Sequence, residues 1–349
     1  MMEHMQTSLF NLQEISLENH DLLVEFYAGD LFDIYSDILV LSAFRGGFAP
    51  IPGTTWGSLH EKLNIGYKLN NPEIQTRISE NMVAFSMPAN RCFSRLYALE
   101  MVSLGNRNSF TLGTLRSRYR ELGQFLEQAG EGNAESISMP LLGTGNQGIS
   151  LQDSVTELLD TIAHLKTTRL KIIRIFAHSW QAIGSLNLKI NSYLQREEAS
   201  QTPLLQAAIE EARTLNLMTL SEISRDTIRK LISLSEASHG SFTTFGIAGR
   251  HFAERITSEL YAHYDLGDCP DTLHLKLVGL THAIIHDRPY VLSYLRLLQN
   301  YGNQAAHAGN HHLTHQDVSA IIIAIVRIID YYESTVVAGS STQGIMKAE

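Results

Sequence analysis

The sequence predicts an α/β three-layer domain with a mostly parallel or mixed sheet, followed by an all-α helical bundle domain. Two observations lead to this fold class. Short apolar segments bounded by Gly, Asp, Asn or Pro alternate with helical segments up to residue 196, which is typical of layered α/β domains. After the polar stretch 196–203, apolar residues recur every three or four positions and no strand-like segment follows. We therefore expect one domain over residues 1–198 and a second over residues 199–340.

The expected strands are rich in Val, Ile, Leu and Phe, as buried strands are. They cover residues 22–30, 37–44, 82–89, 97–105, 136–143 and 170–178. Helices are expected between them around 53–64, 111–129, 151–165 and 180–196. In the second domain the helical pattern covers 203–216, 220–237, 244–264, 271–286, 288–300 and 315–335, with breaks at Pro270 and Pro289.

Composition and charge narrow the class of protein. Of the 349 residues, 44% are hydrophobic and 18% are charged, which excludes a mainly disordered chain. The net charge is −9 and neither half has a basic excess, so RNA stays open as a partner but is not supported by the charge. The longest apolar stretch, 320–326, is too short to span a membrane, and residues 1–20 do not read as a signal peptide. We expect a cytoplasmic protein without membrane association.

A glycine-rich loop is the sharpest local feature. Gly143, Thr144, Gly145, Asn146, Gln147 and Gly148 follow an apolar strand and precede an amphipathic helix. Glycines let the backbone approach a ligand, and the start of a helix offers free N–H groups to a phosphate. The spacing matches G-x-G-x-x-G, but the motif follows several strands and no acidic residue ends the next strand, so the dinucleotide-binding interpretation is weak. A tight turn without a ligand is the structural alternative.

A second motif lies nearer the amino terminus. Residues 27–32 read Tyr-Ala-Gly-Asp-Leu-Phe and are followed by the apolar strand 37–44. Together with PLLGTGNQG at 140–148, this order resembles a macro domain, over roughly residues 10–196. The resemblance implies that Asp30 hydrogen-bonds the adenine amine of ADP-ribose and that the glycine-rich loop wraps its diphosphate. It also places Leu31, Ala43 and His178 among the ligand-binding residues.

The segment after the second strand departs from the macro-domain pattern. Hydrolytic macro domains continue there with Asn-Ala-Ala-Asn, whereas residues 42–47 read Ser-Ala-Phe-Arg-Gly-Gly. Phe44 or Arg45 occupies the position of the catalytic asparagine, so the resemblance implies binding rather than hydrolysis. Gly46 and Gly47 remain as phosphate contacts, and Arg45 can pair with an anion. The aromatic residues of the 44–56 loop, Phe48 and Trp56, are explained either by stacking on a base or by burial in the core.

The helical domain carries a third motif. Arg296 precedes the run 300–307, Asn-Tyr-Gly-Asn-Gln-Ala-Ala-His, and together with 249–255 this resembles the HEPN-like helical superfamily. HEPN ribonucleases pair an arginine with a nearby histidine for metal-independent acid–base chemistry in a site shared by two protomers. The resemblance makes His307, Asn300 and Asn303 catalytic candidates, with Arg296 as a phosphate partner, although Gln299 stands nearest the usual arginine. Alternatively, Asn303 and His307 cap a junction between two helices, and the domain serves dimerisation or partner binding.

No metal and no cofactor is expected. His307, His311, His312 and His315 cluster in sequence, and His282 with His286 shares one helical face, but no HExxH motif or nearby thiolate accompanies them. The two cysteines, Cys92 and Cys269, lie too far apart in sequence for a thiolate site. A solvated polar loop explains the histidine run.

These motifs combine into one functional hypothesis. A macro-like domain senses ADP-ribose or a related NAD-derived signal nucleotide and acts on a helical effector or oligomerisation domain in a homo-oligomer. Such chains resemble prokaryotic antiviral nucleotide-sensor effectors of Thoeris type. Two alternatives stay open: an ADP-ribosyl hydrolase with a helical recruitment domain, and a non-catalytic partner-binding scaffold.

Overall fold

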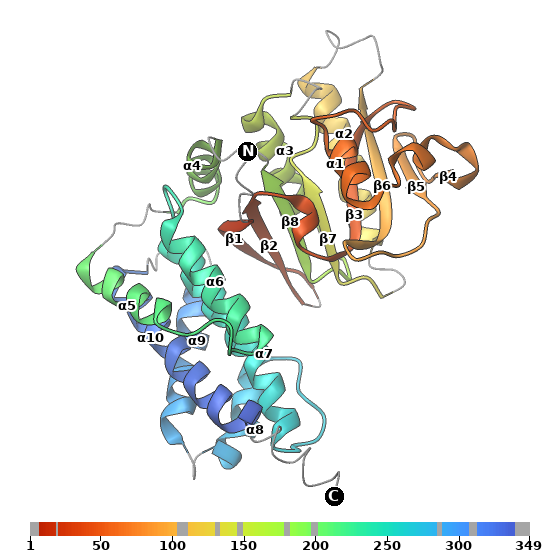
Figure 1. The fold of residues 1–349 in the computed structure, drawn as a ribbon. Helices are drawn as coiled ribbons and strands as arrows, with labels where there is room; N and C mark the ends of the chain where they lie inside the picture. Colours follow the sequence, from red (N-terminus) through yellow and green to blue (C-terminus); the bar gives the residue numbers. More distant parts are fainter. Residues whose placement is uncertain are drawn as a thin grey trace, which may run out of the picture. The chain divides into compact units, whose positions relative to one another are not determined.

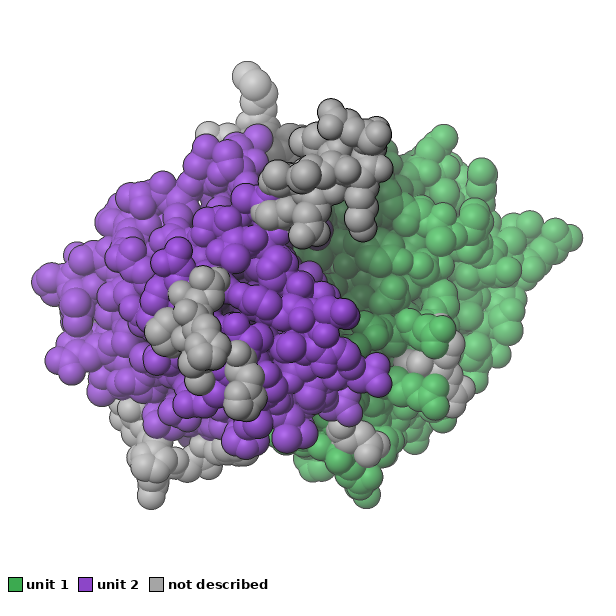
Figure 2. All heavy atoms as spheres, turned by 90° about the horizontal axis from the view of Figure 1, so that it is seen from below, with its two compact units in different colours: residues 1–9, 14–193 green, residues 10–13, 194–349 purple. Residues whose placement is uncertain are grey.

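The computed structural model describes residues 7–18, 20–102, 111–129, 133–144, 149–177, 182–196, 202–284, 288–306 and 313–338. The chain divides into two compact units, shown in different colours in Figure 2. The first contains residues 1–9 and 14–193, and the second contains residues 10–13 and 194–349. Most of the sheet belongs to the first unit, and the helices from α5 onward belong to the second (Figure 1).

An eight-stranded sheet forms the centre of the α/β unit, in the order β1-β2-β8-β7-β3-β6-β5-β4. The strands are β1 (Ser8–Ser16), β2 (Asp21–Ala28), β3 (Ser36–Phe44), β4 (Gln75–Arg77), β5 (Met82–Phe85), β6 (Phe93–Val102), β7 (Ser136–Pro140) and β8 (Ile172–Ala177). The five strands from β2 to β6 in this order run parallel, whereas β6, β5 and β4 pair antiparallel. The sheet is therefore mixed, with a parallel centre.

Helices cover both faces of this sheet. They are α1 (Thr55–Leu63), α2 (Leu112–Gln128), α3 (Leu151–Ala163) and α4 (Ile183–Tyr193). On one face, Phe85, which pairs with Leu96, lies with its ring centroid 5.9 Å from that of Trp56 in α1. On the other face, the next residue of β6, Tyr97, lies 4.7 Å from Phe125 in α2. Because successive strand residues point to opposite faces, α1 and α2 lie on opposite sides and the unit has three layers.

The central strands read as continuous apolar runs because both of their faces are covered. Residues Leu22–Ala28 of β2 are all buried, although the run contains Glu25. The ionic partner of Glu25 is Arg174 on β8, at 2.9 Å, and its second hydrogen-bond partner is the Tyr27 hydroxyl at 3.0 Å. A buried carboxylate is stable only with such partners.

The second unit is all-helical among its described residues from 202 onward. Its helices are α5 (Pro203–Arg213), α6 (Glu222–Glu236), α7 (Phe242–His263), α8 (Leu273–Ile284), α9 (Pro289–Ala306) and α10 (His315–Tyr332), followed by a π-helical turn over Glu333–Val337. Small residues bring α7 and α9 close together. A Cβ on Gly246 would lie 2.6 Å from Ala305 Cβ, and one on Gly302 would lie 2.3 Å from Arg250 Cβ. A capping box of Thr314 and Asp317 starts α10.

The predicted fold class is confirmed: a three-layer α/β unit with a mixed sheet, followed by an all-helical unit. Each expected strand and helix is present, and all but one end within four residues of the expected positions; the exception is α9, which continues to Ala306 although the pattern ended this helix at residue 300. The expectation misses β1, in which polar residues interrupt the apolar ones, and β4, a three-residue edge strand without a buried residue. No helix in the described part of the chain is long and apolar enough to cross a membrane.

Candidate functional site

The carboxyl ends of the parallel strands define the candidate site. The chain leaves β3 toward β6 and leaves β7 toward β8, so the connections after the neighbouring strands β3 and β7 run in opposite directions along the sheet. Ligands of open α/β sheets bind in the crevice at such a switch point. The segments that follow β2, β3 and β7 at this edge contain Asp30, Arg45 and Gly143, and all three come from the motifs predicted to bind the ligand.

Asp30 follows β2 and is held in place from both of its carboxylate oxygens. Its Oδ1 accepts a hydrogen bond from the Phe32 backbone N–H at 2.9 Å, and its Oδ2 lies 2.7 Å from Lys62 Nζ. The side chain is 37% exposed, so solvent and ligands can reach it. Since an ionised carboxylate offers about four acceptor positions, Asp30 can accept a further hydrogen bond from an amine.

Lys62, near the end of α1, bridges two aspartates. Its ammonium also lies 3.1 Å from Asp33 Oδ1 and 5.9 Å from the centroid of the Phe32 ring. Burial alone would lower the pKa of Lys62, but the hydrogen bonds and charges of Asp30 and Asp33 raise it above its usual value. One positive charge therefore stands between two carboxylates at the edge of the sheet.

Gly29 lets the chain turn directly before Asp30. Its φ is +123°, and a Cβ at this position would lie 2.6 Å from the Thr7 hydroxyl oxygen. That hydroxyl accepts a hydrogen bond from the Asp30 N–H at 2.9 Å and donates one to Asp33 Oδ2 at 2.7 Å. The amino-terminal segment thereby fixes the backbone on which Asp30 is carried.

The glycine-rich loop begins with a residue in the left-handed backbone region and is closed by a backbone hydrogen bond. Gly143 has φ +81°, and a Cβ there would lie 2.1 Å from Ile149 Cδ1. The Ile149 N–H donates to Gly143 O at 3.1 Å, directly before Ser150 caps the start of α3. The predicted ligand residues Gly145, Asn146, Gln147 and Gly148 lie between these two anchors and outside the described residues, as does His178.

A tight turn follows β3, and its backbone donors are already used. Gly47 N–H donates to Phe44 O at 2.8 Å, and Gly46 N–H donates to Glu100 Oε1 at 2.7 Å. Glu100 is 1% exposed and forms an ion pair with Arg77 at 2.8 Å. Gly46 and Gly47 can therefore contact a phosphate through these N–H groups only if the turn rearranges. Arg45, between them and Phe44, is exposed.

The aromatic residues of the same loop belong to the core. Phe48 is 2% exposed and Trp56 is 5% exposed, and both pack against Phe85 with ring centroids 5.1 and 5.9 Å away. The Trp56 indole N–H donates to Ser42 O at 2.8 Å. Of the two explanations for these aromatics, burial in the core is the one observed. Ala43 is buried as well, and Leu31 is 6% exposed.

In the helical unit, α9 carries three of the four catalytic candidates on one face. Arg296, Asn300 and Asn303 are exposed, and their spacing of four and three residues aligns them along the helix. Arg296 Nη2 also lies 3.4 Å from the Thr281 hydroxyl. Because α9 continues to Ala306, Asn303 lies within the helix and does not cap its end. His307, the fourth candidate, lies outside the described residues.

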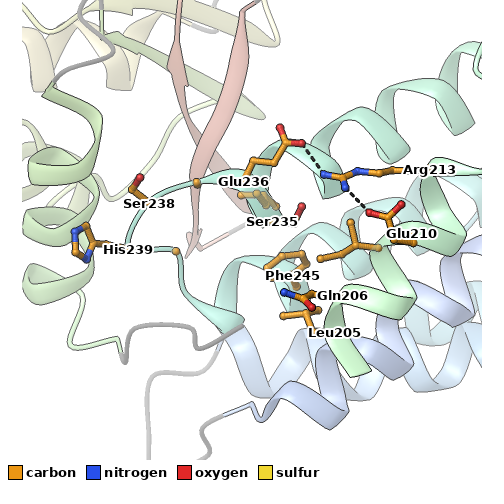
Figure 3. Close-up of a pocket in the computed structure, with 13 residues that line it drawn as sticks. Leu205, Gln206, Glu210, Arg213, Ser235, Glu236, Ser238, His239 and Phe245 are labelled. Atoms are coloured by element: carbon orange, nitrogen blue, oxygen red, sulfur yellow. Dashed lines mark hydrogen bonds and ion pairs between the residues drawn. The ribbon is translucent and has the colours of Figure 1, made fainter. Parts of the chain in front are cut away.

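The helical unit also contains a cavity of about 670 Å³ between α5, α6 and the turn before α7 (Figure 3). Its apolar floor includes Leu205, Leu234 and Phe245. At its rim, Arg213 is held between Glu210 at 2.5 Å and Glu236 at 2.7 Å, as the dashed lines show. None of the residues predicted from the sequence to be catalytic or ligand-binding lines this cavity.

Two residues important for the geometry of the edge escaped sequence analysis. Glu100 could have been noticed, because a carboxylate within the apolar run 96–102 requires a buried partner. Nothing in the sequence marked Lys62, because it lies far from Asp30 along the chain and the two residues come into contact only in the folded structure. No group of three or more metal-ligating side chains occurs in the described ranges.

The α/β part of the chain is similar to solved macrodomain structures. A macrodomain of Oceanobacillus iheyensis with ADP is 14% identical, with a TM-score of 0.41, over 55% of this chain and 99% of that one. A macrodomain of Trypanosoma brucei in complex with ADP-ribose is 16% identical, with a TM-score of 0.37, over 47% and 67% of the two chains. The macrodomain of Thermus aquaticus DarG is 12% identical, with a TM-score of 0.34, over 44% and 97%. No protein-family model and no curated protein matches the chain.

Proposed function

We propose that the α/β unit binds ADP-ribose or a related NAD-derived nucleotide at the carboxyl edge of its sheet. The observation that carries this proposal is Asp30, a fixed and partly exposed carboxylate that follows β2 at this edge. A carboxylate that keeps free acceptor positions suits the exocyclic amine of adenine. The macro-domain motifs of the sequence, and neighbours whose structures contain ADP or ADP-ribose, point to the same ligand class.

We propose that the segment between Gly143 and Ile149 binds the phosphates of the nucleotide. Gly143 takes a conformation that only glycine adopts easily, and α3 starts two residues after Ile149. The amino end of a helix favours an anion through its free N–H groups and its dipole. The exposed guanidinium of Arg45 supplies a positive charge from the neighbouring strand end.

We propose that the α/β unit binds the nucleotide without hydrolysing it, and the turn after β3 supports this. Phe44 has no polar group and the guanidinium of Arg45 has only donors, so neither side chain offers the acceptor oxygen of the usual asparagine. The carboxylate nearest to this turn, Glu100, is buried and committed to Gly46 and Arg77. Turnover of an ADP-ribosylated protein would overturn this form of the proposal and favour the hydrolase.

The test is thermal unfolding of the full chain with and without ADP-ribose. A ligand that binds only the native state at one hundred times its Kd stabilises it by about 2.7 kcal/mol. Asp30→Ala should abolish this shift. Asp33→Ala is the matched control, because Asp33 also pairs with Lys62 and is exposed to a similar degree, 42%. Equal shifts for the wild type and Asp30→Ala would contradict the proposed site.

For the helical unit we propose an effector or oligomerisation role that depends on the bound nucleotide, in a homo-oligomer active in antiviral defence. The exposed row of Arg296, Asn300 and Asn303 on α9 supports a site on this face. If it cleaves RNA, His307→Ala and Arg296→Ala should abolish cleavage, whereas Arg288→Ala, an exposed arginine just before α9, should not. Absence of cleavage together with a ligand-dependent change of oligomeric state would favour the oligomerisation role.

A further inference from the structure

Asp30 and Lys62 place a hydrogen-bond acceptor and a donor side by side at the carboxyl edge. Lys62 Nζ lies 2.7 Å from Asp30 Oδ2, and the two side chains are 30% and 37% exposed, so a ligand can reach both. An ammonium group has only donors, and an ionised carboxylate has only acceptors. A ligand with a donor and an acceptor next to each other on one edge can therefore bind both side chains at once.

The elements that carry Asp30 and Lys62 fix both groups. Asp30 precedes the short 3₁₀ turn Leu31–Asp33, and its Oδ1 accepts a hydrogen bond from the Phe32 backbone N–H at 2.9 Å. Lys62 lies in the last turn of α1, where the helix dipole favours a positive charge. Its ammonium also lies 3.1 Å from Asp33 Oδ1. The donor and the acceptor are therefore held in place by contacts within the protein.

Lys62 keeps one N–H donor for a ligand. An ammonium group has three donors, and the oxygen partners of Lys62 among the described residues are Asp30 and Asp33. Burial acts against its charge, but the hydrogen bonds and charges of these aspartates raise the pKa of Lys62, so all three hydrogens are present at neutral pH. The Phe32 ring, 5.9 Å from Nζ, offers a weaker contact than a hydrogen-bond acceptor would.

The Watson–Crick edge of adenine has the complementary groups. Its exocyclic amine N6 is a donor, and the neighbouring ring nitrogen N1 is an acceptor. We propose that Lys62 donates a hydrogen bond to N1 while Asp30 accepts one from N6, so that the site selects nucleotides with an unsubstituted N1. This role of Lys62 rests on the proposed binding of an adenine nucleotide. It excludes adenine nucleotides that are alkylated at N1, because these lose the acceptor and place a substituent against the ammonium.

Calorimetric titration of the full chain with ADP-ribose and with 1-deaza-ADP-ribose tests the proposal. The analogue replaces N1 by C–H and retains the N6 amine, the riboses and the diphosphate. The wild type should bind the analogue about tenfold more weakly, because a hydrogen bond to a charged donor is lost. Lys62→Met should bind the two ligands with nearly equal Kd. A change in the charge of the site or in the orientation of Asp30 weakens both ligands alike, so the ratio of the two Kd values reports only the contact with N1.

Two control variants and three outcomes make the test decisive. Asp33→Ala leaves Lys62 beside Asp30, so the preference for ADP-ribose should remain, and Lys166→Met, at an exposed position, should change neither Kd. Equal Kd values for the wild type, with ADP-ribose binding lost in Asp30→Ala, would overturn the role of Lys62 and leave the proposed function standing. The same preference in the wild type and in Lys62→Met would also overturn it. Absence of ADP-ribose binding by the wild type would overturn both.

Discussion

Lys62 Nζ lies 2.7 Å from Asp30 Oδ2, so the carboxylate proposed to bind adenine has a basic partner from α1. Asp33 shares the same ammonium at 3.1 Å. Lys62 has two effects that favour an anionic nucleotide. Its ammonium holds the Asp30 carboxylate in one orientation, and it reduces the net negative charge of Asp30 and Asp33 from two units to one.

Replacing Lys62 should weaken the binding of ADP-ribose. In Lys62→Met, Asp30 loses one of its two fixed contacts, and two unneutralised carboxylates face a ligand that carries a diphosphate. We expect the Kd to rise severalfold and the loss to shrink at high salt, because exposed charges are screened. Titration calorimetry at two ionic strengths measures this, with Lys62→Arg as the charge-conserving control. A lower Kd for Lys62→Met would mean that the lysine competes with adenine for Asp30.

Gly143→Ala should destabilise the α/β unit by more than its backbone conformation alone requires. A positive φ costs an alanine about 1–2 kcal/mol, and the new Cβ would also meet Ile149 Cδ1 at 2.1 Å. Gly53→Ala is the matched control, because Gly53 has φ +76° with open space around it. Urea unfolding should give a larger loss for Gly143→Ala, and Ile149→Val should recover part of the difference. Equal losses for both glycines would show that Ile149 moves away freely.

Removing Arg77 and removing Glu100 should lower the free energy of unfolding by different amounts, although both changes break the same ion pair. Glu100 is buried, whereas the Arg77 side chain is 46% exposed. Arg77→Met leaves a buried carboxylate with the Gly46 N–H as its remaining described partner, which is costly. Glu100→Gln keeps an acceptor for Gly46 and leaves the arginine to water. Chemical unfolding should show the larger loss for Arg77→Met, by about 1–3 kcal/mol, and the reverse order would contradict the assigned roles.

Asp37 should contribute to stability above pH 4 and lose that contribution in acid. Burial would raise the pKa of Asp37, but hydrogen bonds from the N–H groups of Glu135 and Ser136 and from the Ser136 hydroxyl hold it below its usual value. A carboxyl whose pKa is lower in the folded state stabilises the fold above its unfolded pKa, and this stabilisation disappears as the pH falls through the folded pKa. Asp37→Asn should therefore flatten the fall in stability between pH 5 and about pH 2.

The acid-unfolding profile of Asp37→Asn needs a control for the loss of one charge. Asp271→Asn, at an exposed position of the helical unit, serves this purpose. Its profile should follow that of the wild type. Identical profiles for Asp37→Asn and the wild type would show that these hydrogen bonds do not stabilise the folded state in acid.

Phe48→Ala should reduce stability without a specific effect on the ligand. The ring is 2% exposed and contacts Trp56 and Phe85, so its removal leaves a core cavity that costs about 3–5 kcal/mol. If the ring instead stacked on a base, the variant would lose affinity at temperatures where it remains folded. Unfolding and ADP-ribose titration of the same variant separate the two roles.

Sequence periodicity predicted most of the fold because buried strands and amphipathic helices leave strong patterns. The prediction failed where contacts between segments distant in the sequence determine the local structure. The pattern ended a helix at residue 300, yet α9 continues through Gly302, whose missing side chain lets Arg250 of α7 approach. Packing thus outweighs the low helix propensity of glycine. Similarly, Gly46 and Gly47 read as free phosphate donors, and only the fold reveals Glu100 and Phe44 O as their acceptors.

The hydrogen bond from Ile149 N–H to Gly143 O joins the two ends of the glycine-rich loop. The positions of β7 and α3 therefore do not depend on how many residues the loop contains. Residues could be added or removed between these two positions without shifting the register of β7 or the start of α3. Related chains could then acquire loops of different length and chemistry for different substituents on the nucleotide while retaining one sheet. Exchanging residues 144–148 between such chains should transfer ligand preference with little change in thermal stability.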